Sequence, residues 1–245
     1  MTIWRDKIDP KITTLMMRMA KSQIDFGVKE IVVDHTKIRK KRRELLLTGQ
    51  AKKPVALFGS LESHEKAINC CQKCPLGETR TKFVYGVGNP HAGIMFVGEA
   101  PGRDEDLKGE PFVGRAGQLL DKILAAINFK RGDVYIANIL KCRPPENRDP
   151  QPAEMELCLP HLMEQINIIR PKIICALGRI SAQALLKTST PLSKLRLRWH
   201  EFNHIPFIVT YHPAALLRFP DYKKDCWEDV KMLRAKYDQL IAEKM

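Results

Sequence analysis

Short apolar runs alternate with longer amphipathic stretches from residue 82 onward. Apolar runs of four or five residues between turn-forming or polar residues are typical of buried strands. Such runs occupy residues 94–97, 134–137, 173–177 and 207–210. Apolar residues at helical spacing occupy residues 115–126, 152–169 and 179–187, and a long terminal helix is predicted from residue 221. This alternation predicts an α/β fold, a three-layer α/β/α architecture with a central, mostly parallel four-stranded sheet.

The first 66 residues have a different character, with fifteen Lys and Arg against eight Asp and Glu. Apolar residues at helical spacing predict a helix within residues 10–26, and residues 30–33 are typical of a short strand. Six of the seven residues in 37–43 are basic, which fits either a solvated helix face or phosphate contacts. We therefore divide the chain into a basic, partly helical extension, residues 1–66, and a main domain, residues 67–245.

The net charge of +13 predicts an anionic partner, for which nucleic acid is favoured over a membrane surface. No apolar run approaches the roughly 18 residues that a membrane span needs, and the N-terminus has no signal-peptide core. Seven cysteines, an odd number, disfavour a secreted disulfide framework. We therefore expect a cytoplasmic protein that binds no membrane.

Four of the cysteines are candidates for a metal site. Cys71 and Cys74 form a CxxC motif, and Cys142 and Cys158 follow after a long gap. Four thiolates are the ligand count of a four-iron cluster or of a structural zinc. The alternative is that these cysteines are reduced and packed in the core. A metal at this site would tie the N-terminal region onto the central domain, because the two pairs meet only in the folded chain.

Polar and glycine-rich loops follow each predicted strand. In an open parallel sheet, functional loops leave the carboxyl ends of the strands. Here those loops are residues 98–102, 138–147, 178–179 and 211–213. They carry glycines, carboxylates, an asparagine and a histidine, so we predict a functional site at this edge of the sheet.

Two of these loops contain candidate catalytic groups. Glu99 and Glu105 belong to an acidic group in a very basic protein, and such carboxylates can orient water or stabilise a cationic transition state. His212 follows a predicted strand, a position that favours catalysis over a purely structural role. Residues 216–218 are apolar and cationic, a composition that suits insertion into a base stack.

Taken together, five motifs resemble those of the family 4 uracil-DNA glycosylases over about residues 68–240. They are the CxxC followed by PLGETR (75–80), GEAPG (98–102), GEPFVG (109–114), KCRPP (141–145) with Asn147-Arg148, and HPAALLR (212–218). The resemblance implies a monomeric DNA repair glycosylase. Such an enzyme flips uracil out of single- or double-stranded DNA and hydrolyses its N-glycosidic bond, leaving an abasic site for base excision repair.

The same resemblance implies a [4Fe–4S] cluster with a structural role. Its ligands would be Cys71, Cys74, Cys142 and Cys158. Cys70 is an ambiguity, because it neighbours a ligand. We expect the remaining cysteines, Cys175 and Cys226, to be packing residues.

The resemblance also assigns roles in the pocket. Phe112 would stack on the flipped base, Asn138 would read its Watson–Crick edge, and Ala100 would line the pocket through its backbone. Asn147 would help to place water near Glu105.

The remaining roles concern the bond cleavage and the DNA. GEAPG has no Asp in its third place, where other superfamily members hold a water-activating Asp, so Glu99 and Glu105 are both candidates for orienting water. His212 would donate a hydrogen bond to uracil O2. The DNA wedge would be formed by Leu216, Leu217 and Arg218.

Two other functions fit part of the sequence. A non-catalytic nucleic-acid-binding protein with a structural four-cysteine metal site would use the basic charge and the cysteines. It would have no use for a carboxylate, an amide and an imidazole at one edge of the sheet. A glycosylase for another deaminated base would need the same edge, with a differently shaped pocket.

Overall fold

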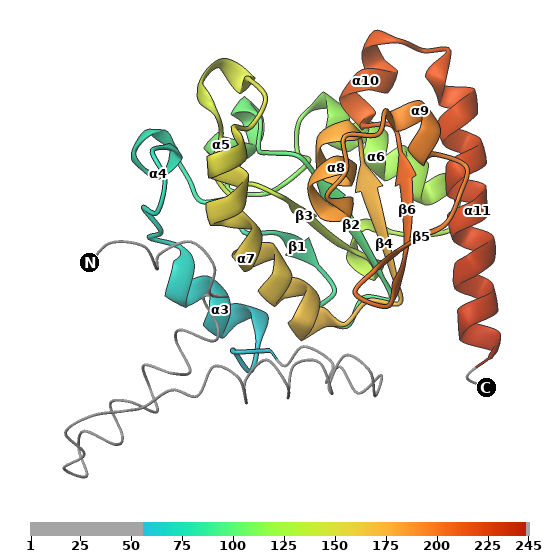
Figure 1. The fold of residues 1–245 in the computed structure, drawn as a ribbon, viewed down its shortest axis with the longest axis horizontal. Helices are drawn as coiled ribbons and strands as arrows, with labels where there is room; N and C mark the ends of the chain where they lie inside the picture. The colour runs from blue at the N-terminus through green and yellow to red at the C-terminus, as the bar shows by residue number, and fades with distance from the viewer. Residues whose placement is uncertain (1–55, 244–245) are drawn as a thin grey trace, which may run out of the picture. The chain divides into compact units, whose positions relative to one another are not determined.

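Four parallel strands form the centre of a six-stranded sheet in the computed structural model, which describes residues 56–243 (Figure 1). The parallel strands lie in the order β3 (Tyr135–Asn138), β2 (Ile94–Gly98), β4 (Ile173–Leu177) and β6 (Ile205–Thr210). Two antiparallel strands, β1 (Val87–Gly88) and β5 (His200–Phe202), form the edges. The predicted fold class is confirmed. The sequence pattern does not predict the edge strands, because they have only two and three residues and are partly exposed.

Helices cover both faces of this sheet, as the three-layer prediction requires. One face is covered by α3 (Leu61–Ile68), α7 (Pro152–Ile169), α8 (Arg179–Leu186) and α9 (Leu192–Leu195). The other face is covered by α6 (Arg115–Ala126), α10 (Pro213–Arg218) and α11 (Tyr222–Ala242). Alternate strand residues point to opposite faces, so Met95 packs in the first core and Phe96 in the second.

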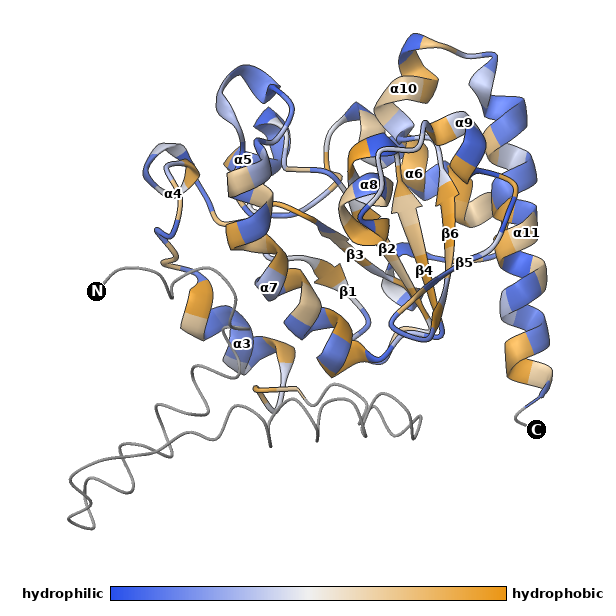
Figure 2. Ribbon diagram, viewed as in Figure 1, coloured by the Kyte–Doolittle hydropathy of each residue, from blue (hydrophilic) through white to orange (hydrophobic). Residues whose placement is uncertain are grey.

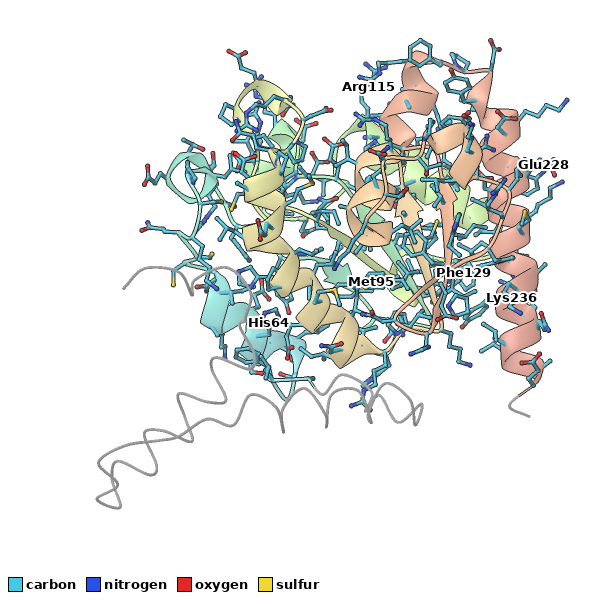
Figure 3. All side chains as sticks on the ribbon, viewed as in Figure 1. His64, Met95, Arg115, Phe129, Glu228 and Lys236 are labelled. Carbon is cyan, nitrogen blue, oxygen red and sulfur yellow. The ribbon has the colours of Figure 1, made fainter. Side chains whose placement is uncertain are left out.

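Burial on both faces explains why the central strands are continuous apolar runs. Every residue of β2, β3 and β4 is buried, and parallel strands covered by helices need apolar residues on each face. Figure 2 shows the central strands of the sheet as largely hydrophobic and α11 as alternating hydrophilic and hydrophobic bands. Met95, in the middle of β2, lies inside the molecule (Figure 3).

Residues 56–66, which the sequence pattern assigns to the N-terminal extension, instead pack on the main domain. The backbone N–H groups of residues 57 and 58 both donate to the Glu164 carboxylate of α7, at 2.8 Å for Phe58. Leu61 in α3 is buried in the first core. The compact unit that contains these contacts begins at Pro54. The helix, strand and basic run predicted within residues 10–43 lie outside the described residues.

Several short elements complete the described part of the chain. They are α4 (Leu76–Thr79), α5 (Arg103–Lys108) and two 3₁₀ turns, Arg131–Asp133 and Pro145–Asn147. Arg115, the first residue of α6, lies near α10 in Figure 3. In residues 56–243 there is no helix with the length and apolar character needed to cross a membrane.

Candidate active site and four-cysteine site

The predicted convergence of strand-end loops is present in the structure. Gly98 at the end of β2 pairs with Asn138 at the end of β3, and Leu177 of β4 pairs with Thr210 of β6. All four strands run the same way, so the loops that follow them leave one edge of the sheet. This edge carries the candidate active site.

Gly98 allows an aromatic ring and an amide to meet at the end of β2. A Cβ at this position would lie 2.7 Å from Cζ of Phe112 and would also overlap Oδ1 of Asn138. The Phe112 ring in turn lies 5.4 Å from the His212 ring, between centroids, with the planes tilted by 35°. The structure therefore brings together three of the predicted pocket residues, Phe112, Asn138 and His212.

Asn138 presents a buried polar atom without a partner. Its side chain is 2% exposed, and its Oδ1 accepts no hydrogen bond from any group within the described part of the chain. A buried acceptor left unpaired costs about 1–3 kcal/mol. A ligand that donates a hydrogen bond at this point would satisfy it.

The His212 imidazole is held in one orientation and in its neutral form. It is the N-cap of α10, and its Nδ1 accepts the backbone N–H of Ala214 at 3.2 Å. Because Nδ1 is the acceptor, Nε2 carries the proton. Burial, with a smaller contribution from the positive charge of Arg218, lowers the pKa of His212 to about 4. At neutral pH this side chain is an uncharged hydrogen-bond donor.

Hydrogen bonds to the Glu105 carboxylate hold the loop that carries Phe112. Phe112 has a φ of 54°, a left-handed conformation that persists only where neighbouring contacts enforce it. One carboxylate oxygen of Glu105 accepts the N–H groups of Val113 and Gly114, at 2.9 and 3.1 Å, and the other accepts that of Gly102 at 3.1 Å. Both oxygens of Glu105, a predicted catalytic residue, are therefore engaged with the backbone, so its contacts indicate a positioning role.

Glu99 has a different environment. Burial and, secondly, the negative charge of Asp149 raise its pKa to about 7, while Arg179 and Arg218 act in the opposite direction. Arg179 and Asp149 form an ion pair of 2.9 Å. The sequence pattern does not single out Asp149 or Arg179, although Arg179 lies in a predicted strand-end loop and Asp149 just beyond another.

Two other predicted pocket residues have different surroundings. Ala100 is partly buried and packs against the first core. Asn147 is exposed, and its amide oxygen accepts a hydrogen bond from Nε of Arg143 at 2.8 Å. In the described residues no hydrogen bond joins Asn147 to Glu105 or to the pocket.

The predicted wedge divides into a core residue and two surface residues. Leu216 is 1% exposed and packs in the second core, so it is not available to DNA in this structure, which corrects its assignment. Leu217 is 39% exposed, and Arg218 is also exposed. The three residues belong to α10 rather than to an irregular loop, and on one helical turn adjacent residues face different directions.

The four candidate metal ligands come from three parts of the chain. Cys71 and Cys74 precede α4, Cys142 follows β3, and Cys158 lies in α7. Burial raises the pKa of the Cys142 thiol, and the neighbouring Cys74 and Cys71 raise it further. Burial also raises the pKa of Cys158 to about 11, with smaller contributions from Cys142 and Cys74. These thiols are therefore close enough to interact electrostatically.

Polar groups from other segments contact the sulfurs. Nη1 of Arg80 donates to Sγ of Cys142 at 3.3 Å, and Nε2 of His161 lies 3.6 Å from Sγ of Cys71. Among residues 56–243, no three His, Cys, Asp or Glu side chains gather closely enough to hold a single metal ion. Cys70 is exposed, whereas Cys175 and Cys226 are buried in the second core, as expected for packing residues.

A buried lysine lies between the cysteines and the pocket. Lys141 is fully buried, and its Nζ donates to the backbone oxygen of Asn138 at 3.0 Å and to Gln165 at 2.6 Å. No carboxylate in the described part of the chain pairs with it, yet buried charges are normally paired. Burial lowers the pKa of Lys141 to about 8, while Cys158 and Cys142 act to raise it. An anionic, thiolate-ligated group beside these cysteines would supply the missing countercharge, so the residues fit such a group.

Comparisons with known proteins agree with this geometry. The model of the Uracil DNA glycosylase superfamily matches residues 85–231. The type-4 uracil-DNA glycosylase of Archaeoglobus fulgidus is 47% identical over 182 residues, which cover 71% of this chain and 92% of that protein. The type-4 uracil-DNA glycosylase of Pyrobaculum aerophilum is 43% identical over 180 residues, covering 70% and 92% of the two chains. The type-4 enzyme of Thermotoga maritima is 42% identical over 161 residues, covering 64% and 83%.

Proposed function

The chain belongs to the uracil-DNA glycosylase superfamily, as a type-4 member, and we propose that the pocket between β2, β3 and β6 is where it excises uracil from DNA. It is a DNA repair enzyme, an N-glycosyl hydrolase that leaves an abasic site. The observation that carries the assignment of the pocket is the unpaired Oδ1 of Asn138 beside the Phe112 ring and the neutral His212 imidazole.

Uracil must leave the base stack before any side chain can reach its glycosidic bond, at a cost of a few kcal/mol. Leu217 and Arg218, which are exposed near the end of α10, would fill the vacated space. The extruded base would stack on Phe112. Oδ1 of Asn138 would accept the N3–H of uracil, while the amide nitrogen would donate to O4. Cytosine has an acceptor at N3 and an amino donor at C4. In the same orientation, Oδ1 of Asn138 would face an acceptor and the amide N–H would face a donor, so neither hydrogen bond would form.

Cleavage breaks the bond between C1′ of the sugar and N1 of uracil, and the bonding electrons leave with the base. Negative charge then develops on O2, and the Nε2–H of His212 would donate to it. A neutral donor suits this role because its proton is already fixed on Nε2 by the contact from Ala214 to Nδ1. One oriented donor of this kind is worth about 3 kcal/mol of the barrier.

Water then adds to C1′ and must lose a proton. We assign its orientation to Glu99, because both oxygens of Glu105 are occupied by backbone N–H groups. With a pKa of about 7, Glu99 is partly ionised at neutral pH and can accept this proton. Glu105 would act indirectly, because its carboxylate holds the loop that carries Phe112. The Asn147 side chain bonds Arg143 and no pocket residue among those described, so we assign it no role in placing water.

Cys71, Cys74, Cys142 and Cys158 would hold a [4Fe–4S] cluster. Each thiolate of such a cluster binds a different iron, so its four ligands need not meet at one point, whereas those of a zinc ion must. The uncompensated charge of Lys141 supports an anionic, thiolate-ligated group at these cysteines. When bound, the cluster supplies cross-links between segments and negative charge rather than a step in hydrolysis.

The test is a glycosylase assay on oligonucleotides that contain uracil, hypoxanthine or a thymine mismatch, in single strands and duplexes. We expect release of uracil, because Asn138 matches its donor and acceptor pattern, and little release of the other bases. Asn138→Leu, which removes both polar atoms at similar volume, is the matched variant and should lose uracil release. Binding of DNA with no cleavage of any base would instead favour a non-catalytic nucleic-acid-binding protein.

A further inference from the structure

Four side chains form a continuous stack beside the active-site edge. Arg196 is buried, and its guanidinium lies 4.3 Å from the centre of the Tyr211 ring. Tyr211 stacks on Tyr222 with ring centres 4.4 Å apart and planes within 5° of parallel. Phe219 extends this row by a tilted contact with Tyr222, with ring centres 5.7 Å apart and planes at 49°. The stack therefore runs from the interior to the surface.

The inner end of this stack is anchored rigidly. Nε of Arg196 donates to Asp229 at 2.7 Å, and Nη2 donates to the backbone oxygen of Asp225 at 2.6 Å. Tyr211 directly precedes His212, so the same anchor supports the end of β6 from which the imidazole projects. The aromatic side chains are thus held in place by a buried ion pair rather than by contacts at the surface.

The outer end of the stack is open. Phe219 is 55% exposed, an unusual exposure for a phenylalanine that already has an ordered aromatic neighbour. It is the C-cap of α10, the short helix whose N-cap is His212, and through Tyr222 it is linked to Tyr211, so it lies beside the candidate active site. Lys223 and Lys224, exposed at the start of α11, add positive charge next to it.

We propose that Phe219 is a stacking platform for the nucleobase next to the extruded uracil. This inference rests on the proposed function, and it adds a contact outside the uracil pocket. The occupant is a nucleobase because the platform is a flat aromatic face beside the candidate active site, flanked by cations that suit the phosphates on either side of that base. Such stacking accepts any base, since every base has a π face.

The platform predicts a preference in substrate structure. A neighbouring base in a duplex is already paired and stacked, so it gains little by moving onto Phe219. In single-stranded DNA the same base is free to stack on the ring. The contact should therefore lower KM mainly for single-stranded substrates and should leave the chemical step unchanged.

The experiment compares Phe219→Ala, Phe219→Trp and Trp227→Ala with the wild-type protein on single-stranded and duplex uracil DNA. Trp227 is the matched control, an exposed aromatic residue on α11 that contacts Lys231 rather than the stack. We expect Phe219→Ala to raise KM for the single strand about tenfold, the scale of one lost stacking contact, with kcat unchanged. Phe219→Trp should restore KM, and Trp227→Ala should change neither constant.

A binding measurement separates this inference from the proposed function. A 2-aminopurine base placed beside a stable abasic-site analogue should lose fluorescence on binding wild-type protein, and should lose much less with Phe219→Ala. If wild-type protein releases no uracil, the proposed function fails, while this measurement still tests the platform. Equal KM values for Phe219→Ala and wild type, no recovery in Phe219→Trp, or an equal loss in Trp227→Ala would each overturn the inference.

Discussion

The proposed uracil pocket and the four-cysteine site are built in opposite ways. The pocket lies at the ends of buried parallel strands, where Phe112 and Asn138 pack against Gly98 and backbone N–H groups bound to the Glu105 carboxylate fix the Phe112 loop. The cysteines come instead from a segment before α4, a strand end and the middle of α7. Around them lie a fully buried lysine and Arg80, which donates hydrogen bonds to the Cys142 thiol and to two backbone carbonyl oxygens.

The two regions differ in the interactions that hold them together. The pocket is preorganised by the fold, since its side chains are positioned by the sheet and by neighbouring backbone. The cysteine site contains a buried lysine that no carboxylate among the described residues balances, which fits the anionic group proposed there. Lys141 connects the two regions, because its Nζ contacts the backbone of Asn138 and its charge acts on Cys142 and Cys158.

The largest expected effect is on the cysteine site. We expect the purified protein to contain about four irons per chain, because the four thiolates each bind one. Cys142→Ser should abolish iron binding and lower the melting temperature, whereas Cys70→Ser, next to a ligand but exposed, should retain the iron. Lys141→Met should reduce iron content, since it removes the countercharge. Iron and zinc analysis with thermal melts checks all three, and zinc without iron after anaerobic purification would contradict the cluster.

The next effect is on catalysis in the pocket. His212→Ala should lower the single-turnover rate on uracil DNA by roughly 100- to 1,000-fold, the scale of one lost oriented donor. Iron content and affinity for abasic DNA should stay close to wild type, because His212 lies away from the cysteines. An unchanged rate would make His212 a structural cap of α10 and nothing more.

The adjacent residues Leu216 and Leu217 of α10 allow a comparison of a buried leucine with an exposed one. Leu216→Ala should cost about 2–4 kcal/mol of unfolding free energy, because it opens a cavity in the second core. Leu217→Ala should change stability by no more than about 0.5 kcal/mol, yet reduce excision from duplex DNA. Denaturant titrations and duplex assays measure the two effects. A large loss of stability in Leu217→Ala would show that both leucines serve packing.

The smallest expected effect is on pH dependence. If Glu99 must be ionised, kcat/KM should rise through about pH 7, the pKa set by burial and Asp149. Asp149→Asn should move that midpoint to lower pH, because a neighbouring negative charge is removed. Glu99→Gln should lose the titration. A midpoint that stays in place in Asp149→Asn would separate the titration from Glu99.

The raised pKa of Glu99 also fixes the sign of a stability effect. Its pKa in the folded protein lies above the ordinary value of 4.5, so ionisation is harder in the folded state. The stability that the protonated group contributes is present below pH 4.5 and is lost as the pH rises through about 7. At pH 8 we therefore expect Glu99→Gln to melt at a higher temperature than wild type, while at pH 4 the two should be alike.

Much of the fold and part of the site follow from local sequence. The four parallel strands are predicted because each is an apolar run between turn residues, and the helix 152–169 because its apolar residues recur at helical spacing. Asn138 and His212 are predicted as site residues because each follows one of these apolar runs. The edge strands are not found, because they are too short and too exposed to leave a pattern.

The sequence by itself determined which residue types stand at the strand ends and that four cysteines were available. Only the tertiary structure decided what each one contacts. Leu216 and Leu217 are alike in sequence, but one faces α6 and the other faces solvent. Glu99 and Glu105 are alike in type, but only Glu105 has both oxygens bound by backbone N–H groups. Local spacing sets the direction of a side chain within its own element, whereas its partners belong to segments distant in sequence.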